Sequence, residues 1–291
     1  MKVKILVPIY NDWQSASKLL DEIDNNISDL DHEISVIIVN DASTHDRQEE
    51  QKDFNNIQSI KILNMKINQG HARCIATGLK YIFEKEEFDY VIPMDGDGED
   101  RPEEIPQFVE KILKNPDIPV VGKRVKRLDN NVFKFCYEIH KISTYLFTGK
   151  LIKFGNFTCI SKSVVKKMIN EKATWNCYSA SLVKITKIRD SIPSIRGKRY
   201  FDLSKMSFYN LIIHSFSIIS VFKINVLIRS IGFIILYTFL IKSNFSIVTS
   251  IPIVLVIIFV IAIFKLSKRE NMEEYNKCLD NISNIEVFEK S

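Results

Sequence analysis

The chain has 291 residues, a formal net charge of +5 and 46% hydrophobic residues, which suits one full-sized domain and a smaller part. Its five cysteines are scattered and form no CxxC pair, so they argue against a disulfide framework and favour a reducing compartment. The opening stretch MKVKILVPIY is apolar over only about six residues, which is too short for a signal peptide and predicts a buried strand.

Strand and helix patterns alternate over roughly the first 200 residues. Short apolar runs rich in Val and Ile predict strands at residues 3–9, 34–39, 60–63, 90–94 and 119–122. Amphipathic patterns between them predict helices over 16–27 and 72–83. Such alternation indicates an α/β fold with a mostly parallel sheet covered by helices on both faces. The ligand crevice of such a sheet lies outside the carboxyl ends of its strands.

Acidic side chains follow three of the predicted strands. The strand ends carry Tyr10-Asn11-Asp12, Asn40-Asp41 and Asp95-Gly96-Asp97. The loop after the first strand has no glycine, which excludes a GxGxxG dinucleotide site there, and no GxxxxGK[ST] motif occurs in the sequence. A bound diphosphate therefore has to be held without a glycine-rich cradle.

The stretch YVIPMDGDGEDRPEEIP, residues 90–106, concentrates negative charge directly behind an apolar run. Asp95 and Asp97 can hold Mg²⁺ or Mn²⁺ while diphosphate oxygens complete the coordination, and such a cation neutralises their repulsion. Taken alone, Asp-Gly-Asp is weak evidence for a metal site and is better explained as a turn with a solvated acid. Pro102, followed by Glu103 and Glu104, predicts the first turn of a helix, where acids complement the helix dipole.

The last third of the chain is far more apolar than the rest. Residues 245–264 carry no charge, and about 20 helical residues span roughly 30 Å of hydrocarbon. Residues 224–241 are similar apart from polar groups such as Arg229, and a buried helix is the alternative there. We therefore expect a transmembrane hairpin over 224–266. Basic residues flank its outer ends, so the positive-inside rule places both ends in the cytoplasm.

Residues 204–223, just before the hairpin, combine a polar stripe with large apolar residues at helical spacing. Such a helix would lie in the membrane interface, and packing on the domain core is the alternative. Residues 267–291 are mixed in charge and predict either a short cytoplasmic helix or a frayed tail.

Four motifs, VPIYND, VNDASTHD, NQGHARCIATGL and MDGDGEDRPEEIP, occur in this order. Together they resemble a family 2 glycosyltransferase of the GT-A fold. More narrowly, the chain is similar to the polyprenyl-phosphate branch, which includes dolichol-phosphate mannose synthase and bacterial undecaprenyl-phosphate glycosyltransferases. The resemblance implies a cytoplasmic GT-A catalytic domain at 1–203, the interfacial helix at 204–223, the hairpin at 224–266 and a cytoplasmic tail at 267–291.

The resemblance also implies roles for individual residues. Asp97 would ligate Mg²⁺ or Mn²⁺, Asp95 would meet the metal shell or the ribose, and Asp100 would reach the sugar or support the site. Asp12 stands where the family usually has Glu. The residues expected to bind the donor are Pro8, Tyr10, Asp12, Asp41, Asn68, Gly70 and Asp95.

Cations are expected on the acceptor side, because the planar fork of Arg suits phosphate. The expected phosphate-binding residues are Arg124, Arg196, Lys198 and Arg199, and Arg124 is also expected to take part in catalysis beside Asp95 and Asp97. Arg124 lies in a cluster with Lys123, Lys126 and Arg127. A solvated surface or contact with lipid headgroups is the alternative for both groups of cations.

Two motifs depart from the family. Asn156 and Thr158 stand where the branch commonly has the Asp and Arg of a Gly-Asp-Phe-Arg stretch. Arg199 and Tyr200 occupy the Ser and Lys positions of an Arg-x-x-Gly-x-Ser-Lys element. Asn156 cannot act as a base, so either the acceptor needs none or acceptor binding has diverged.

The resemblance implies an inverting glycosyltransferase in the inner (plasma) membrane that moves a sugar from a nucleotide-sugar donor to a polyprenyl phosphate, for cell-envelope glycans. Because a phosphate acceptor is already ionised near neutral pH, it needs no strong base. A glycan hydroxyl acceptor and a non-catalytic membrane partner protein are the alternatives. Membrane lipids are expected partners, homo-oligomerisation is left open, and nucleic acid is not expected because the hairpin and the crevice account for the basic excess.

Overall fold

The structure is a computed structural model that describes residues 1–47, 53–126, 131–201 and 208–290. Arg127 and residues 204–207 of the expected interfacial helix lie outside the described residues. The described chain divides into two compact units. Unit 1 comprises Met1–Leu128, Lys153–Leu203 and Met272–Ser291, and unit 2 comprises Asp129–Ile152 and Ser204–Asn271.

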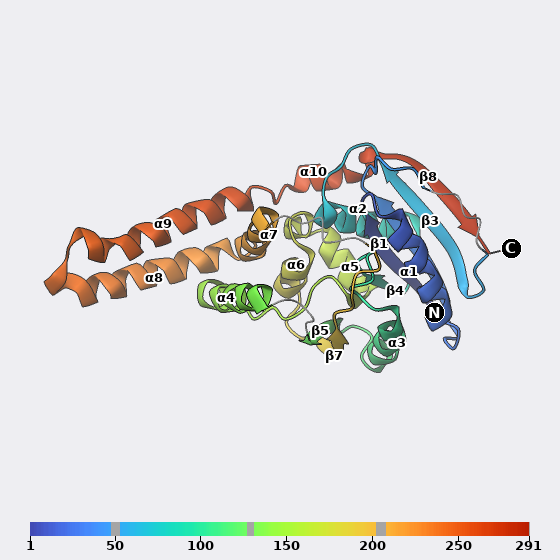
Figure 1. Cartoon of the computed structure of the whole chain (residues 1–291), viewed down its shortest axis with the longest axis horizontal. Coiled ribbons are helices and arrows are strands. Elements are labelled where there is room, and N and C mark those ends of the chain that lie inside the picture. Colours follow the sequence, from blue (N-terminus) through green and yellow to red (C-terminus); the bar gives the residue numbers. More distant parts are fainter. Residues whose placement is uncertain (48–52, 127–130, 202–207, 291) are drawn as a thin grey trace. The chain divides into compact units, whose positions relative to one another are not determined.

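In the part of the chain that the structure describes, eight strands form a mixed sheet in the order β7-β5-β6-β4-β1-β2-β3-β8 (Figure 1). The strands are β1 (Lys2–Ile9), β2 (Glu33–Asn40), β3 (Ile57–Met65), β4 (Tyr90–Pro93), β5 (Val120–Lys126), β6 (Thr158–Ser161), β7 (Asp190–Ile195) and β8 (Ile282–Glu289). β1 pairs in parallel with β2 and β4, and β2 with β3, whereas β6 and β8 join antiparallel. The predicted strands and the mostly parallel character of the sheet are confirmed.

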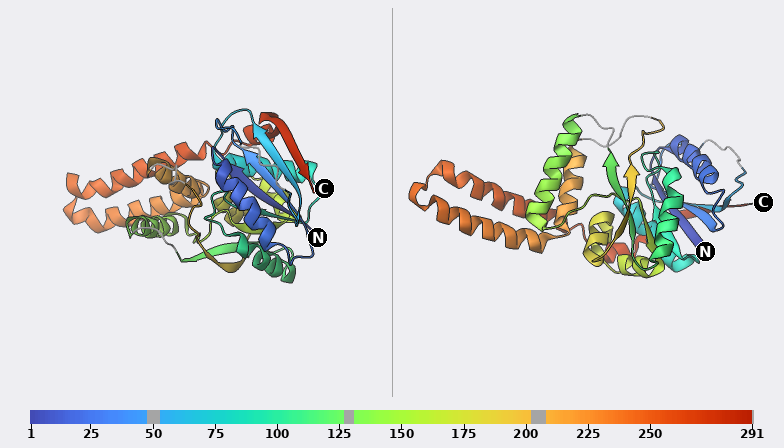
Figure 2. Two further views of the ribbon diagram at one scale, coloured as in Figure 1. Left: turned by 45° about the vertical axis from the view of Figure 1, so that its right-hand side comes forward. Right: turned by 90° about the horizontal axis from the view of Figure 1, so that it is seen from below.

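Helices cover both faces of the sheet, as the alternating pattern predicts (Figure 2). Side chains of α1 (Trp13–Asn26) and α3 (Ile105–Lys114) pack against Val3, Ile5 and Val7 on one face. Side chains of α2 (His71–Lys85), α5 (Lys162–Ile169) and α6 (Tyr178–Ile185) pack around Leu6 on the other. This two-sided burial explains why β1 and β2 are almost continuously apolar.

Gly78 allows α2 to lie close to the sheet. A Cβ atom at this position would overlap the side chain of Leu6 and would also approach Val39 Cγ2 within 3.1 Å. Glycine is the residue that permits such an approach. The amino end of α2 is thereby held next to the loops that follow β1 and β2.

Unit 2 consists of helices. They are α4 (Asn131–Thr148), α7 (Phe208–Ser220), α8 (Lys223–Ile241) and α9 (Ile247–Ser267), with a short turn η3 (Lys242–Asn244) between the last two. The rings of Phe147 and Phe259 lie 4.3 Å apart, and Asn225 Nδ2 donates to the Thr148 carbonyl at 3.1 Å. These contacts join α4 to the long helices.

The helices α8 and α9 have the length and apolar composition of membrane-spanning helices and form the predicted hairpin (Figure 1). Only 11% and 6% of their most apolar windows are buried within the chain. A core helix of a globular protein would be mostly buried, so these side chains require an apolar environment outside the chain. This is the expected property of a membrane protein.

The compact units group the chain differently from the division expected from the sequence. Residues 129–152, which were expected inside the catalytic domain, belong to unit 2 because α4 packs on α7 and α8. The exposed apolar side chains of α4 include Ile139, Ile142 and Leu146, at 49%, 55% and 59% exposure. They follow helical spacing, a signal that the sequence analysis did not use.

The C-terminal segment, residues 272–289, returns to the sheet of unit 1. It forms α10 (Met272–Asn276), a turn η4 (Cys278–Asn281) and β8, which pairs antiparallel with β3. The ring of Tyr275 is fully buried, stacks 5.4 Å from Trp175, and its hydroxyl donates to the Ala76 carbonyl at 3.2 Å. The predicted short helix is present, and the alternative of a frayed tail is wrong because β3 offers an open edge that β8 fills.

Candidate functional site

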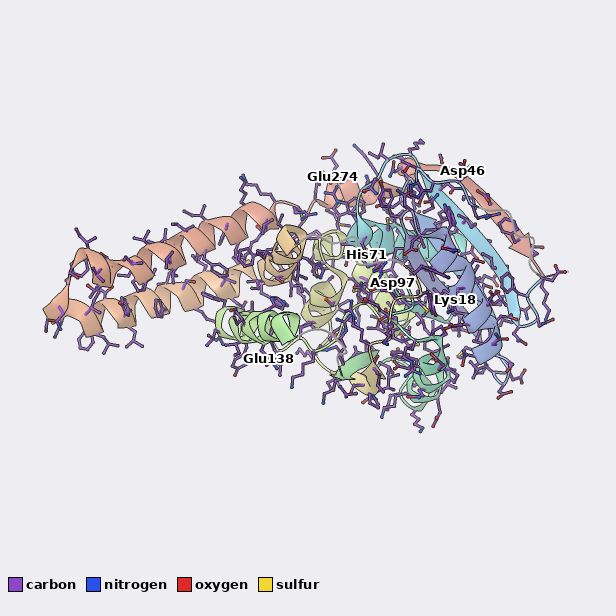
Figure 3. All side chains as sticks on the ribbon, viewed as in Figure 1. Lys18, Asp46, His71, Asp97, Glu138 and Glu274 are labelled. Atoms are coloured by element: carbon purple, nitrogen blue, oxygen red, sulfur yellow. The ribbon has the colours of Figure 1, made fainter. Side chains whose placement is uncertain are left out.

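Three acidic loops leave the sheet at one edge. Ile9 at the end of β1 pairs with Asn40 at the end of β2, and Leu6 of β1 pairs with Pro93 at the end of β4. Because these strands are parallel, the loops that follow them start side by side. Figure 3 labels Asp97 in the third loop and His71 at the start of α2, and His71 Nε2 lies 3.2 Å from Asp95 Oδ1 of that loop.

The loops after β1 and β2 are joined through Asn11. Its backbone has a φ of 52°, which Asn tolerates better than most residues, and its Oδ1 accepts from Thr44 N at 2.7 Å and His45 N at 3.1 Å. Pro8 is buried in β1, whereas Tyr10 is 43% exposed. The joined loops therefore present an aromatic ring to the open side of the sheet edge.

Asp41 shapes the turn that opens α2. Its two carboxylate oxygens accept from the backbone amides of Gln69 and Gly70, both at 2.8 Å, and its own carbonyl accepts from Asn68 Nδ2 at 3.1 Å. Gly70 has a φ of 93°, which favours glycine, and it stands at the N-cap of α2. With only 3% exposure, Asp41 positions this turn in the structure, so its expected contact with the donor stays a prediction.

Asp95 is held by groups from three parts of the chain. Its Oδ1 lies 3.2 Å from His71 Nε2 and 3.3 Å from Asn156 Nδ2, and its backbone amide donates to Asp100 Oδ2 at 2.9 Å. The amide of Asn156 also lies 2.9 Å from His71 Nε2. Asn156, which stands where the family branch commonly has Asp, therefore contacts Asp95 directly.

Asp97 and Asp12 share one cation. Arg199 Nη1 lies 2.6 Å from Asp97 Oδ2, and Arg199 Nη2 lies 3.2 Å from Asp12 Oδ2. The second oxygen of Asp97 accepts from the amide of Glu99 at 3.0 Å. The loops after β1 and β4 are thus joined through a guanidinium from beyond β7.

We call residues 95–100 the acidic loop and residues 196–200 the basic segment. The amide of Gly197 donates to the Glu99 carbonyl at 2.8 Å, and that of Tyr200 donates to the Asp97 carbonyl at 3.0 Å. Arg196 also forms an ion pair with Glu99. Two backbone hydrogen bonds and two arginines therefore dock the basic segment on the acidic loop.

The carboxylates of the acidic loop differ in their ionisation. Burial disfavours the charge of Asp97, and the neighbouring Asp95 adds to this, so the pKa of Asp97 rises to about 6. Burial and Asp95 raise the pKa of Asp100 to about 8 in the same way. Burial also opposes the charge of Asp95, but His71 and then Arg124 outweigh it and lower the pKa of Asp95. Negative charge is therefore in excess here, a condition that a cation relieves.

Arg124 reaches the same carboxylates from β5. It helps to lower the pKa of Asp95 and opposes the rise in the pKa of Asp100. Its guanidinium passes over Gly155, where a Cβ atom would lie 2.6 Å from Nη2. A side chain at position 155 would have to displace the end of the Arg124 side chain, so Gly155 leaves room for the arginine in this position.

The oxygen-rich set around Asp97 suits a hard divalent cation but is incomplete. Among the described residues, no group of three or more His, Cys, Asp and Glu side chains is arranged to hold a metal ion. In this structure the guanidinium of Arg199 is the cation that pairs with Asp97 and Asp12. Two carboxylates therefore fit a divalent cation only if a ligand supplies further oxygens.

The structure brings half of the predicted site residues together around the acidic loop. The residues gathered around the acidic loop are Asp12, Asp95, Asp97, Arg124, Arg196 and Arg199. Lys198 is exposed and forms no ion pair with the residues that the structure describes, 1–47, 53–126, 131–201 and 208–290. Glu104 accepts from the amide of Ile195 at 2.9 Å, so it anchors the end of β7 besides opening the turn before α3.

His71 is the site residue that the sequence analysis missed. It begins α2 directly after Gly70, and the predicted donor-binding role of Gly70 was the available signal. Its side chain is 45% exposed beside Asp95. A lone histidine after a glycine turn carries no sign of its partner, because Asp95 and Asn156 come from distant parts of the chain.

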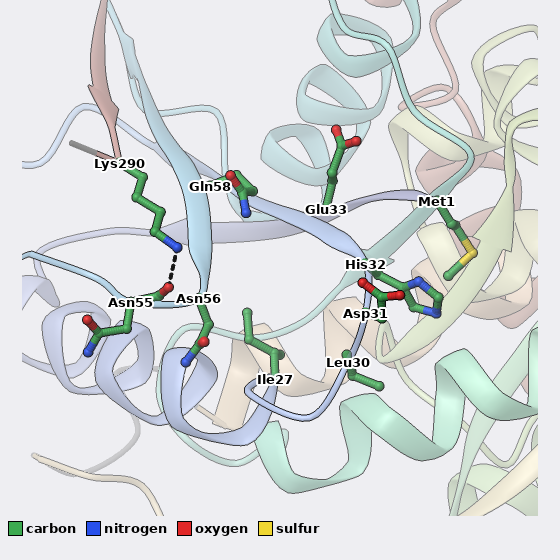
Figure 4. Close-up of a pocket in the computed structure, with 10 residues that line it drawn as sticks. All are labelled: Met1, Ile27, Leu30, Asp31, His32, Glu33, Asn55, Asn56, Gln58 and Lys290. Atoms are coloured by element: carbon green, nitrogen blue, oxygen red, sulfur yellow. Dashed lines mark hydrogen bonds between the residues drawn. The ribbon is translucent and has the colours of Figure 1, made fainter.

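The site is distinct from a cavity of about 390 Å³ at the opposite edge of the sheet (Figure 4). That cavity lies at the amino ends of β2 and β3, and Lys290 donates to the Asn55 carbonyl across it. Its lining includes none of the carboxylates described above.

Comparison with known proteins is consistent with this geometry. The profile of Glycosyl transferase family 2 matches residues 4–176, more than half of the chain. A curated relative, undecaprenyl-phosphate 4-deoxy-4-formamido-L-arabinose transferase of Klebsiella pneumoniae, is 26% identical over 220 residues, covering 72% of this chain and 64% of that protein. The dolichol-phosphate mannosyltransferase of Pyrococcus furiosus is 28% identical over 126 residues, covering 43% of this chain and 34% of that protein.

A solved structure of glucosyl-3-phosphoglycerate synthase from Mycobacterium tuberculosis, with Mn²⁺, UDP-glucose and phosphoglyceric acid, has a TM-score of 0.55. It is 12% identical, and the match covers 77% of this chain and 79% of that chain, so the likeness supports the fold alone. The chain thus spans 64% of the length of the first curated relative and shares the fold of a glycosyltransferase of known structure. The extent of the profile match shows that the chain belongs to glycosyl transferase family 2.

Proposed function

We propose that the chain is a membrane-anchored inverting glycosyltransferase that transfers a sugar from a nucleotide-sugar donor to a polyprenyl phosphate. The observation that carries this proposal is the convergence of Asp12, Asp95 and Asp97 with Arg196 and Arg199 at the carboxyl edge of the sheet. The curated relatives are named as transferases of a sugar to undecaprenyl phosphate or dolichol phosphate. The two long apolar helices in the same chain suit a lipid acceptor.

On the donor side, we assign the nucleoside to the joined loops after β1 and β2. The exposed ring of Tyr10 offers a surface for a base, and Pro8 and Asp12 support that loop. Asn68 and Gly70 form the turn that opens α2, whose amino end favours an anionic or hydroxyl group. Asp41 holds this turn in place for the donor.

Asp95 and Asp97 are the residues that would hold Mg²⁺ or Mn²⁺. Bound there with the diphosphate, the cation supplies stabilisation for the negative charge that develops on the leaving nucleoside diphosphate. His71 and Asn156 fix one oxygen of Asp95, so this carboxylate keeps a defined orientation. Asp100 supports the loop through the Asp95 amide.

On the acceptor side, Arg124, Arg196, Lys198 and Arg199 are proposed to bind phosphate. A phosphate monoester is ionised near neutral pH, so the reaction requires positioning and charge neutralisation more than proton removal. Asn156 cannot remove a proton, and an ionised phosphate acceptor has no proton that must be removed. The amide at this position is therefore compatible with a phosphate acceptor, and divergent acceptor binding is the alternative.

The proposed division of the chain follows from these assignments. Residues 1–203 are proposed as the cytoplasmic catalytic domain, 204–223 as the interfacial helix, 224–266 as the hairpin and 267–291 as a cytoplasmic segment that completes the sheet. Lys223 and Arg229 flank one outer end of the hairpin, and Lys265 and Lys268 flank the other. This distribution supports the proposed orientation in the inner membrane.

The test is a screen of radiolabelled nucleotide sugars with the full chain in detergent, Mn²⁺ or Mg²⁺, and undecaprenyl phosphate. We expect label in a lipid product whose mass equals the acceptor plus one sugar, with loss on EDTA treatment. Transfer only to hydroxyl acceptors would reject the lipid phosphate but keep the donor chemistry. If no nucleoside diphosphate binds in the presence of the metal ion, the catalytic proposal itself fails.

A further inference from the structure

Arg199 lies at the carboxylate that is proposed to bind the divalent cation. Its guanidinium bridges Asp97 and Asp12, at 2.6 and 3.2 Å, and the three side chains are only 19%, 15% and 15% exposed. A partly buried ion pair is screened by solvent much less than an exposed one. Asp97 therefore already has a cationic partner in this structure.

The backbone holds Arg199 in this position. Hydrogen bonds from the amides of Gly197 and Tyr200 fix the residues on both sides of it to the acidic loop, at 2.8 and 3.0 Å. The hydroxyl of Tyr200 donates to Glu22 of α1 at 2.5 Å. A Cβ atom at Gly98 would lie 2.6 Å from the Tyr200 ring, so glycine at this position with a φ of 87° permits the docking. The packing of the basic segment therefore holds Arg199 in place beside Asp97.

The two arginines of the basic segment retain unused donors. The Nε atoms of Arg196 and Arg199 are buried and have no hydrogen-bond partner among the described residues. A buried donor without a partner is unfavourable, because it has lost its water. An oxygen anion entering beside the acidic loop would supply the missing acceptors, and the fork of a guanidinium is suited to phosphate oxygens.

We propose that Arg199 is a resident counter-cation of Asp97 that the divalent cation has to displace. It thereby weakens binding of the free ion and makes ion binding depend on the donor's diphosphate. The inference rests on the proposed function, in which the donor supplies that diphosphate. Two cations at one carboxylate repel each other, and the displaced guanidinium regains an anionic partner only when diphosphate oxygens arrive with the ion.

The test measures Mn²⁺ binding to the full chain in detergent, from the electron paramagnetic resonance signal of the free ion, without a nucleotide and then with UDP or GDP. For Arg199→Gln we expect binding of Mn²⁺ alone about tenfold tighter than in the wild type. The gain on adding UDP or GDP is expected to be smaller than in the wild type. The matched control, Arg101→Gln, also removes one positive charge near the loop, but Arg101 pairs with Glu103, so we expect less than about a twofold change.

Arg199→Lys separates charge from packing, since it keeps one positive charge on the same segment. We expect its Mn²⁺ affinity to lie between those of the wild type and Arg199→Gln. Unchanged or weaker binding in Arg199→Gln overturns the proposal, as does equally tight binding in Arg199→Lys. If Mn²⁺ binds to no form of the chain even with UDP or GDP, the metal site of the proposed function fails as well.

Discussion

The acidic loop and the C-terminal segment both join residues that are distant in the sequence, but they differ in how completely their polar groups are paired. In the C-terminal segment, Tyr275 donates to Ala76, and Trp175 Nε1 donates to Glu274 at 3.0 Å. In the acidic loop, burial and mutual repulsion raise the pKa of Asp97, and buried donors of the facing arginines lack partners among the described residues. The first arrangement stabilises the fold, whereas the second remains ready for a ligand.

The largest expected effect is on stability, from removing the Tyr275 ring. Tyr275→Ala leaves a cavity beside Trp175 and Ala76, and we expect a loss of about 3–5 kcal/mol in the free energy of unfolding. Urea unfolding of the full chain in detergent measures it. In a Trp13→Phe background, Trp175 is the remaining tryptophan and reports on this packing directly.

The control for this change is Glu273→Ala on the same helix. Glu273 is 79% exposed and pairs with the exposed Lys277. We expect its unfolding curve to overlay that of the wild type within about 0.5 kcal/mol. Equal losses in both variants would mean that the C-terminal segment does not contribute through the buried ring.

Asp97→Asn tests the proposed ligand-binding role of the acidic loop. It removes the charge that Arg199 and the proposed metal ion share, and we expect sugar transfer to fall by about two orders of magnitude or more. Circular dichroism should show an unchanged fold. Glu103→Gln, in the same stretch but paired with Arg101, should keep nearly full activity. Retention of full activity by Asp97→Asn would remove Asp97 from the metal site.

Much of the fold was accessible from the sequence because buried parallel strands and amphipathic helices have periodic patterns. The strands from β1 to β5 and the hairpin follow from such patterns. The position of Asp97 beside Asp12 follows from the rule that parallel strands end at one edge. These features depend on local pattern or on topology, which a single sequence retains.

Other features depend on pairing between distant residues and have no local pattern. β8 is largely exposed and mixed in composition, so its strand conformation depends on pairing with the edge of β3. The contact of His71 with Asp95 and Asn156 needs three separate segments to be in place. Arg199 was expected to bind phosphate, but its ion pair with Asp97 could not be seen without the course of the basic segment.

Glu86 is a buried carboxylate like those of the acidic loop, but its charge is paired with two lysines. Its carboxylate lies 3.1 Å from Lys4 Nζ and 2.5 Å from Lys61 Nζ. Burial alone would raise its pKa, but the hydrogen bonds from Lys61 and Lys4 outweigh burial and lower it. We expect Glu86→Gln to cost about 1.5–3 kcal/mol of unfolding free energy at pH 7.

The sign of the pH dependence follows from the lowered pKa. Stabilisation by Glu86 is fully present above its unfolded pKa of about 4.3 and is lost as the pH falls through the lower folded value. The difference between wild type and Glu86→Gln should therefore be constant from pH 7 to about 5 and shrink below about 4. Urea titrations at each pH measure it. Glu87→Gln, where the carboxylate is 85% exposed, is the neighbouring control.

The smallest expected effect concerns Glu274 and Arg73, an ion pair in the C-terminal region with side chains 49% and 26% exposed and a separation of 3.1 Å. Glu274→Gln removes the charge but keeps an oxygen for Trp175 Nε1, and the guanidinium of Arg73 stays over the Trp175 ring, 5.0 Å from its centroid. We expect a coupling of only about 0.2–1 kcal/mol in a double-mutant cycle with Arg73→Gln.

The Arg73–Glu274 and Arg199–Asp97 ion pairs should differ in their dependence on salt. The Arg73–Glu274 coupling should fall toward zero as salt is raised from about 0.05 to 1 M, because exposed charges are screened over a Debye length of about 3 Å at 1 M. The more buried Arg199–Asp97 pair should keep most of its coupling under the same conditions. If both couplings disappear together, Arg199 is as accessible to solvent as Arg73. A solvent-accessible Arg199 would dissociate from Asp97 too readily to weaken the binding of a divalent cation.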